Sequence, residues 1–277
     1  MPGTASRYRL WLMVEQQGAW GHDALLQSDL PAEVGAALKR VSRDIGMRTL
    51  LIKRRERDRG GGRRCFVAYT GVHERRIGVI EVTDPRELLD IDLPGAASRR
   101  FDGLGQPHHG PLFLVCTHGK HDPCCARRGG PLYRSIETLP DAWECTHIGG
   151  DRFAANLVCF PHGLYFGRVG EGAGRAVAEA YAEGRIDLDH YRGRSAYSPP
   201  VQAAEDVLRR RHGLVGVDDL DLVAHVELGG DVHRVEFDHG ARRHVVDVEV
   251  TSTPPDLLTC KAVVPHSVRA FAAVSGG

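Results

Sequence analysis

Seven cysteines are spread unevenly along this chain of 277 residues, and five of them lie between Cys116 and Cys159. A secreted disulfide framework usually has an even number of cysteines and follows a signal peptide. The apolar run near the amino terminus, residues 10–14, is too short for a signal sequence or a membrane span. We therefore expect a cytoplasmic protein whose cysteines are reduced thiols, metal ligands or redox groups.

The charge balance argues against several classes of function. The chain carries 36 basic and 36 acidic residues, so its formal charge is zero. Binding to nucleic acid or to an anionic membrane through bulk charge needs a strong basic excess, so we expect neither as a partner. No Walker A, G-x-G-x-x-G or G-x-S-x-G motif is present, which leaves nucleotide binding and serine hydrolase chemistry without support.

The order of strand and helix signals predicts two tandem units of similar build, each reading strand, helix, strand, hairpin of two strands, helix, which is a βαββα order when the hairpin is counted once. The signals of the first unit lie at residues 9–14, 31–45, 49–53, 65–69, 76–82 and 84–89. Those of the second unit lie at residues 111–116, 130–139, 142–147, 157–160, 164–169 and 172–184. The thioredoxin-like fold has this βαββα order, so we predict an α/β (α+β) protein with mixed sheets.

A smaller module is predicted after the second unit. Residues 201–212 form an amphipathic helix that Gly213 caps, and three alternating runs that follow it indicate an antiparallel meander. Polar segments at 94–110 and 191–200 are typical of linkers. The predicted division is a thioredoxin-like unit at 1–95, a second one with a Cys/His cluster at 110–190, and an α+β module at 200–277.

The candidate chemistry lies in two loops of the second unit. One loop reads CTHGKHDPCCA from Cys116, and the other reads WECTHIGGDRFAAN from Trp143. Each follows a strand, and neighbouring strands of a βαβ unit open their loops at one sheet edge. Two thiolates with imidazole or carboxylate suit Zn²⁺ or an iron–sulfur cluster. The spacing is neither that of a zinc ribbon nor C-x-x-C.

These two segments, extended to THIGGDRFAANLVCFPHGLYFGRV, resemble the sucrase/ferredoxin-like family, strongly over about residues 112–169 and more weakly elsewhere. The resemblance implies a thioredoxin-like ferredoxin domain that holds a [2Fe–2S] cluster through two cysteines and an H-x₃-H pair. On this sequence the cysteines are Cys116 and Cys125, and the first histidine is His147. The second histidine position holds Asp151, where the chain departs from the family pattern.

Three interpretations of Asp151 remain open, because aspartate is a hard donor and a poor match for an iron–sulfide centre. In the first, Asp151 itself is the fourth ligand. In the second, Cys124, Cys145 or Cys159 supplies that ligand. In the third, the site no longer holds a cluster. Of these cysteines, Cys145 is as readily a buried neighbour as a ligand, and the apolar neighbours of Cys159 favour a core thiol.

The remaining candidates have plainer interpretations beside the functional ones. Cys65 and Cys260 are expected to be structural, and His118 and His121 either tune a cluster or are exposed loop residues. The glycines Gly149 and Gly150 let the backbone pass a metal or simply form a turn. The charged run 54–64 is a solvated loop or a docking patch for an acidic redox partner.

The leading hypothesis is an electron-transfer protein that binds a [2Fe–2S] cluster and works with an unidentified redox partner. Histidine ligation would raise its reduction potential above that of an all-cysteine cluster. One alternative is a structural zinc-binding or interaction module on the same cysteines, and another is a thiol redox protein that uses the vicinal pair Cys124 and Cys125. The family label suggests sugar hydrolysis, but the sequence singles out no facing pair of carboxylates. We therefore expect an electron carrier rather than a hydrolase.

Overall fold

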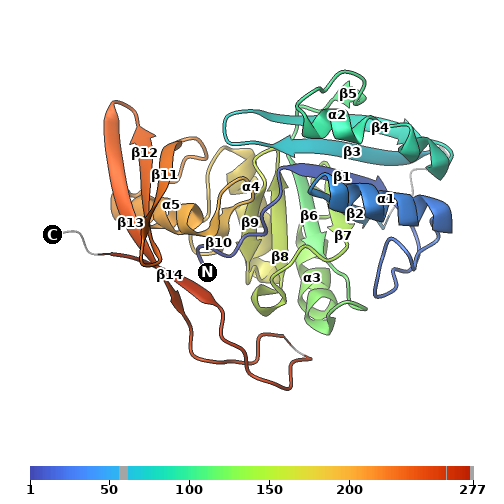
Figure 1. The fold of residues 1–277 in the computed structure, drawn as a ribbon. Coiled ribbons are helices and arrows are strands. Elements are labelled where there is room, and N and C mark those ends of the chain that lie inside the picture. Colours follow the sequence, from blue (N-terminus) through green and yellow to red (C-terminus); the bar gives the residue numbers. More distant parts are fainter. Residues whose placement is uncertain (56–61, 260, 275–277) are drawn as a thin grey trace.

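Two β-sheets organise the residues that this computed structural model describes, which are 1–55, 62–259 and 261–274 (Figure 1). The larger is a mixed ten-stranded sheet in the order β10-β9-β8-β6-β7-β2-β1-β3-β4-β5. The smaller is four-stranded, in the order β11-β12-β13-β14. The protein is therefore a mixed α/β protein, as predicted. Most of the charged run 54–64 and Cys260 lie outside the described residues.

The first half of the large sheet is a βαβ crossover followed by a hairpin. Helix α1 connects parallel strands β1 and β2, and the antiparallel strands β3 and β4 continue the sheet beyond β1. The bounds are β1 Leu10–Glu15, α1 Ala32–Asp44, β2 Met47–Lys53, β3 Arg63–Thr70, β4 Arg75–Val82, η1 Pro85–Leu89, α2 Leu93–Ala97 and β5 Gln106–Pro107.

The second half repeats the arrangement of the first. Helix α3 connects parallel strands β6 and β7, and the antiparallel strands β8 and β9 follow on the other side of β6. The bounds are β6 Leu112–Cys116, α3 Pro123–Ile136, β7 Ala142–Cys145, η2 Asp151–Phe153, β8 Asn156–Phe160, β9 Leu164–Gly167 and α4 Glu171–Ala182. Strands β2 and β7 pair antiparallel, which joins the two halves into one sheet.

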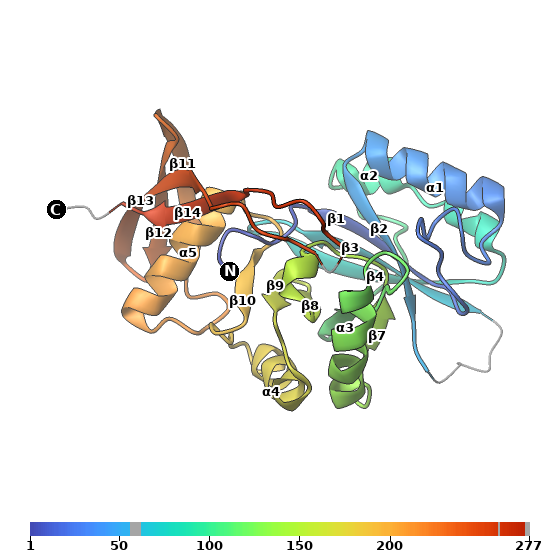
Figure 2. The same cartoon turned by 90° about the horizontal axis from the view of Figure 1, so that it is seen from below.

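Alternating residues of the strands enter different apolar cores, which explains why whole strands are buried. In β1, Leu10, Leu12 and Val14 pack under α1 and α2, whereas Trp11 and Met13 face strands of the second half. The ring centroids of Trp11 and Phe160 lie 5.1 Å apart across this shared core. Helices α3 and α4 cover a third core, and Figure 2 shows them on a different side of the molecule from α1 and α2. The sheet therefore curls around a core common to both halves.

Both predicted linkers are wrong, because each contains a strand of the large sheet. The segment 94–110 includes most of α2 and strand β5, and it buries Ala96 and Leu104. The segment 191–200 begins with β10 (Tyr191–Arg194), which is buried throughout despite its two arginines. Arg192 donates to Asn156 Oδ1 at 2.8 Å, and Arg194 donates to the Val217 carbonyl at 2.8 Å. Paired guanidinium groups can thus lie in a core that a polar sequence pattern hides.

The carboxy-terminal module has the predicted helix and meander, with one further strand. Its elements are α5 Pro199–His212, β11 Asp221–Gly229, β12 Val232–His239, β13 Arg242–Ser252 and β14 Arg269–Ala273. Gly213 follows α5 with φ = +67°, which confirms the predicted cap. An arm between β13 and β14 runs along the molecule, and Figures 1 and 2 both bring its tip near the start of α3.

Candidate metal centre

Cys116 is the last residue of β6 and lies in the shared core with 1% of its surface exposed. Helix α3 packs very closely on this end of the strand. A Cβ atom at Gly129 of α3 would collide with the carbonyl oxygen of Cys116. Glycine at this position therefore allows the helix to approach the strand that carries the first thiol.

Cys125 lies in the first turn of α3, not in a loop as predicted. The helix begins at Pro123, seven residues earlier than expected, because Asp122 caps it and proline suits its first turn. The Asp122 carboxylate accepts a hydrogen bond from the backbone N–H of Cys124 at 2.7 Å. The helix start thus fixes Cys125 rigidly, and its dipole favours a thiolate there.

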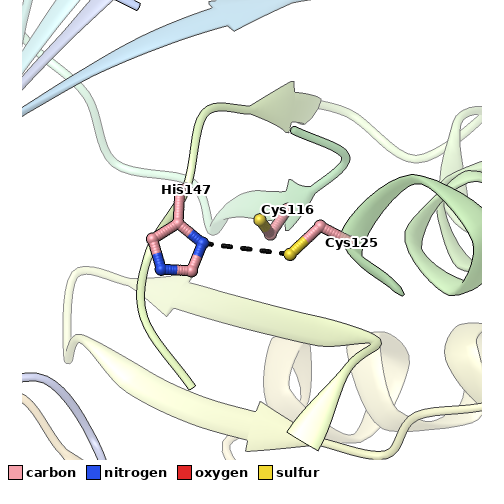
Figure 3. A group of neighbouring side chains, drawn as sticks. All are labelled: Cys116, Cys125 and His147. Carbon is pink, nitrogen blue, oxygen red and sulfur yellow. Dashed lines mark hydrogen bonds between the residues drawn. The ribbon is translucent and has the colours of Figure 1, made fainter. Parts of the chain in front are cut away.

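His147 follows β7 by two residues, and neighbouring groups fix its backbone. Its N–H donates to Nδ1 of His118 at 3.3 Å, and its carbonyl accepts a hydrogen bond from Arg48. Nδ1 of His147 lies 3.8 Å from Sγ of Cys125 (Figure 3). One donor atom from each of Cys116, Cys125 and His147 lies within 4.8 Å of the other two. The three residues that sequence reasoning chose first therefore converge.

The pKa values of the two thiols are shifted in opposite directions. A hydrogen bond from Cys125 is the main cause that lowers the pKa of Cys116, and His147 lowers it further against the effect of burial. The same hydrogen bond, followed by burial, raises the pKa of Cys125. A buried thiolate beside a thiol and an imidazole is a site where a metal cation can replace the shared proton.

Asp151 is the first residue of η2 and approaches the other side of the His147 ring. Its Oδ1 lies 3.1 Å from Nε2 of His147, yet this buried oxygen accepts no hydrogen bond of good geometry from the described residues. Burial raises the pKa of Asp151. A buried oxygen without a hydrogen bond next to an imidazole is compatible with ligation and with a role in orienting the ring.

His121 belongs to this group as well, although the sequence suggested only a tuning role or exposure. Its ring stacks on that of His147, with centroids 3.9 Å apart and planes 21° apart. One donor atom each from His121, His147 and Asp151 lies within 4.8 Å of the others. Burial, followed by the neighbouring histidines, lowers the pKa of His121 to about 4. The imidazole is therefore neutral near pH 7 and free to ligate.

The other cysteines occupy different surroundings. Cys145 ends β7 directly opposite Cys116 and is fully buried, and burial raises its pKa, but it is in neither donor group. Cys124 is buried at the start of α3. Cys159 and Cys65 lie in the two outer cores, which confirms their interpretation as core thiols. The free thiols among the described residues are those of Cys65, Cys116, Cys125, Cys145 and Cys159.

The glycines Gly149 and Gly150 make room for groups other than the donors. Both have left-handed φ values, +90° and +80°. A Cβ at Gly150 would strike the guanidinium of Arg192, and one at Gly149 would strike the hydroxyl of Ser6. The turn is therefore shaped by its neighbours and by its conformation.

Sequence reasoning missed the contribution of the first half, whose loop 16–30 closes the site on one side. His118 is buried, and its Nε2 lies 2.7 Å from the carbonyl oxygen of Gly21. The Trp20 ring packs edge-on against His118, with centroids 5.9 Å apart. His118 therefore connects loop 16–30 to the backbone of His147. The only signal for this contact in the sequence was the Trp-Gly-His stretch of the loop, whose residues could line a metal site.

Two buried thiols beside a half-buried imidazole are donors that suit a soft or borderline metal. For a tetrahedral ion with bonds of about 2.0–2.3 Å, sulfur and nitrogen ligands are separated by roughly 3.6 Å. The observed 3.8 Å between Cys125 and His147 fits such an arrangement. The spacing of the donor atoms therefore suits one metal ion, and the types of donor also suit an iron–sulfur cluster.

Comparison with known proteins identifies the family. The model of the sucrase/ferredoxin-like family matches residues 1–193, so the chain belongs to this family. A similar protein is "Altered inheritance of mitochondria protein 32" of Meyerozyma guilliermondii, 32% identical over 95 residues. The match covers 30% of this chain and 34% of that protein, about a third of its length. No solved structure matches significantly. In the described part of the chain, no helix is long and apolar enough to cross a membrane.

Proposed function

We propose that the protein is an electron-transfer protein that binds a [2Fe–2S] cluster at this centre. The observation that supports the proposal best is the convergence of the buried thiols of Cys116 and Cys125 with Nδ1 of half-buried His147. Membership of the sucrase/ferredoxin-like family adds to it. When bound, such a cluster takes up and gives back one electron at a time.

The side chains have separate roles in this proposal. Cys116 and Cys125 would hold one iron as thiolates, with the metal taking the place of the proton whose hydrogen bond to Cys116 raises the pKa of Cys125. His147 holds the other iron through Nδ1, because this nitrogen faces the thiols. The shared core around the two cysteines would keep these ligands in place when the charge changes.

The fourth ligand is Asp151 or a substitute close to His147. Asp151 and His121 both bring a donor atom near His147, and a His121 ligand would restore the two-histidine set of the family pattern. Cys145 is the cysteine alternative, because Cys124 is disulfide-bonded in the structure and would have to be reduced first. Nitrogen-sensitive spectroscopy distinguishes these possibilities, because a His121 ligand adds a second histidine coupling that His121→Ala removes, whereas an Asp151 or cysteine ligand leaves the coupling of His147 alone.

Further parts of the proposal concern fold and location. The matching βαββ order of the two halves supports a thioredoxin-like origin for each. Five of the described cysteines are free thiols and Cys124 is disulfide-bonded, and the five free thiols favour a reducing compartment such as the cytoplasm. The name of the relative in Meyerozyma guilliermondii refers to mitochondria, so fractionation of the native cells should include that organelle.

Anaerobic reconstitution tests the proposed function. The purified protein is incubated with ferrous iron, sulfide and a thiol, then desalted and analysed for iron, acid-labile sulfide and visible absorption. We expect about two irons and two sulfides per chain and a colour that dithionite bleaches. A colourless protein without iron or sulfide would overturn the proposal.

A zinc site is the second candidate, and one observation favours it. All three donor atoms lie within 4.8 Å of one another, as one tetrahedral ion requires. Zinc in place of iron and sulfide, in protein purified without added metal, would identify a structural module. A reversible disulfide detected by alkylation and mass spectrometry would instead indicate the thiol redox alternative.

A further inference from the structure

Two loops, one from each half of the sheet, meet beside the metal centre and enclose a surface hollow. They are loop 16–30, after β1, and loop 117–122, after β6. The hollow has a volume of about 420 Å³ and is lined by Trp20, Lys53, Thr117, His118, Gly119 and Lys120. Because His118 also contacts the backbone of His147, this hollow is the outer side of the site itself.

Lysine is rare in this chain, yet each lysine either lies in one of these two loops or forms a hydrogen bond or an ion pair with a residue of one of them. The sequence has 36 basic residues, of which only four are lysines. Lys53 donates to the Gly18 carbonyl at 3.0 Å and lies 4.2 Å from the centre of the Trp20 ring. Lys120 is an exposed residue of loop 117–122.

The other two lysines reach the loops from distant parts of the chain. Lys261, in the arm between β13 and β14, donates to the carbonyl of His121 at 3.0 Å and to that of Lys120 at 3.4 Å. Lys39, on α1, forms an ion pair with Asp23 of loop 16–30. We call Lys53, Lys120 and Lys261 the lysine rim, since none of them has a carboxylate partner within the described residues.

No carboxylate among the described residues forms an ion pair with a lysine of the rim, but Glu144 lies opposite Lys53 in the β2–β7 pair and exposed Asp29 lies beside Gly18. Asp122 is buried and caps α3, Glu144 accepts a hydrogen bond from Thr117 at 2.7 Å, and Asp23 is paired with Lys39. The chain as a whole has no net charge, so the positive rim is a local feature. Lysine ammonium groups are strongly hydrated and flexible, which suits brief encounters better than permanent ion pairs.

A row of imidazole rings connects the rim to the donor group. His22 of loop 16–30 is exposed, and its ring centroid lies 5.3 Å from that of His121. His121 in turn stacks on His147 at 3.9 Å. A redox protein bound at the rim would therefore lie within a few side chains of the metal ligands.

We propose that the lysine rim is a docking surface for an acidic redox protein, which exchanges one electron with the metal centre past His121. This inference rests on the proposed function. In each encounter the reduced protein loses one electron, the oxidised partner gains it, and no covalent bond changes. Complementary charge would mainly raise the association rate and make it sensitive to salt.

Small redox ions of opposite charge test the sign of the rim. The reduced protein is mixed in a stopped-flow instrument with ferricyanide, an anion, or with tris(phenanthroline)cobalt(III), a cation, at several salt concentrations. The test variant is the double substitution Lys53→Glu and Lys120→Glu. The control is Arg211→Glu with Arg242→Glu, exposed residues of the carboxy-terminal module that give the same change in net charge.

We expect salt to slow oxidation of the wild type by ferricyanide and to accelerate oxidation by the cobalt complex. The lysine variant should react with ferricyanide about tenfold more slowly at low salt, with the salt effect reduced or reversed. The arginine variant should stay within about twofold of the wild type. Equal slowing in both variants would overturn the inference, whereas unchanged visible and EPR spectra show that the metal centre is intact.

A binding measurement provides a readout that needs no metal centre. Wild type and both variants are titrated calorimetrically with an acidic plant-type ferredoxin at low salt, as a probe of stated charge. Weakening by about tenfold in the lysine variant alone supports the docking surface, even if reconstitution yields no cluster and the proposed function fails. Absence of binding by the wild type, or equal weakening in both variants, overturns the docking surface whether or not a cluster forms.

Discussion

The two halves of the large sheet share one strand order but carry very different loops at the same place. In each half a helix crosses between parallel strands, β1 to β2 by α1 and β6 to β7 by α3. Loop 117–122 and the first turn of α3 lie beside Cys116 and supply Cys125 and His121. Loop 16–30, its counterpart, contains no cysteine and supplies Trp20 and the Gly21 carbonyl as a wall.

This difference separates the scaffold from the chemistry. The repeated βαββ arrangement brings both loops to one site, and only the residues in the loops decide which half offers donor atoms for a metal. The first half is then more than a packing partner, because it fixes His118 and through it the backbone of His147. The following predictions test this division between a donor half and a supporting half.

The largest effect should follow loss of a thiol from the donor half. Cys116→Ser and Cys125→Ser each remove a thiolate, so we expect metal affinity to fall by more than about 100-fold. This loss is larger than that expected when a residue that only hydrogen-bonds a ligand is removed. Cys65→Ala alters a core thiol of the first half and should leave iron and sulfide content unchanged. Equal metal loss in all three variants would show that the halves are not divided in this way.

Removing the contact between the loops should have the next largest effect. His118→Ala deletes the link from Gly21 to the His147 backbone, and outer contacts of this kind are worth about 10–100-fold in metal affinity. Competition with a coloured chelator measures the change. His22→Ala, at an exposed residue of loop 16–30, is the control and should stay within about twofold. An unchanged affinity in His118→Ala would remove the supporting role of the first half.

The two crossover helices offer a matched pair of glycines. A Cβ at Gly129 of α3 would strike the carbonyl of Cys116, and one at Gly35 of α1 would strike that of Leu25. Each alanine substitution should lower the free energy of unfolding by about 1–3 kcal/mol in urea denaturation, because both sites are already filled. Only Gly129→Ala should also weaken metal binding, since it displaces the strand end that carries Cys116.

The smallest effect concerns pH and the hairpin turns of the two halves. His162, between β8 and β9, is half-buried against Tyr181, whereas His73, between β3 and β4, is exposed. Burial lowers the pKa of His162 from 6.5 to about 3. The folded protein therefore binds fewer protons than the unfolded chain between these values, and stability falls as pH drops below 6.5.

At pH 5 this linkage amounts to about 2 kcal/mol. We expect His162→Gln to flatten the plot of unfolding free energy against pH between 4 and 6.5, as measured in urea. His73→Gln should retain the slope of the wild type. A slope that persists in His162→Gln would assign the pH dependence to other groups.

The sequence was informative where function depends on local pattern. Cys116, Cys125 and His147 could be predicted because loops that follow neighbouring strands open at one edge. The early start of α3 was also encoded, in Asp122 and Pro123, but the glycines after Arg128 drew the predicted start to residue 130. The buried strand β10 escaped detection because Arg192 and Arg194 read as polar until their partners are known.

Long-range contacts account for what could not be predicted. His118 and Gly21 are 97 residues apart, and neither residue type specifies the other. The stacking of His121 on His147 depends on how α3 packs against β6, which no pattern within the loop reveals. The gathering of the lysines at one rim likewise appears only once both halves and the arm are placed together.

Pulsed EPR of the reduced, reconstituted protein tests the central claim most directly. A sample labelled with ¹⁵N-histidine is compared with unlabelled protein and with His147→Cys. We expect the signal of a reduced [2Fe–2S] cluster with nitrogen couplings that change on labelling, and a loss of at least one coupling in His147→Cys. A cluster signal without any histidine nitrogen coupling, or one zinc per chain and no cluster signal, would contradict the account.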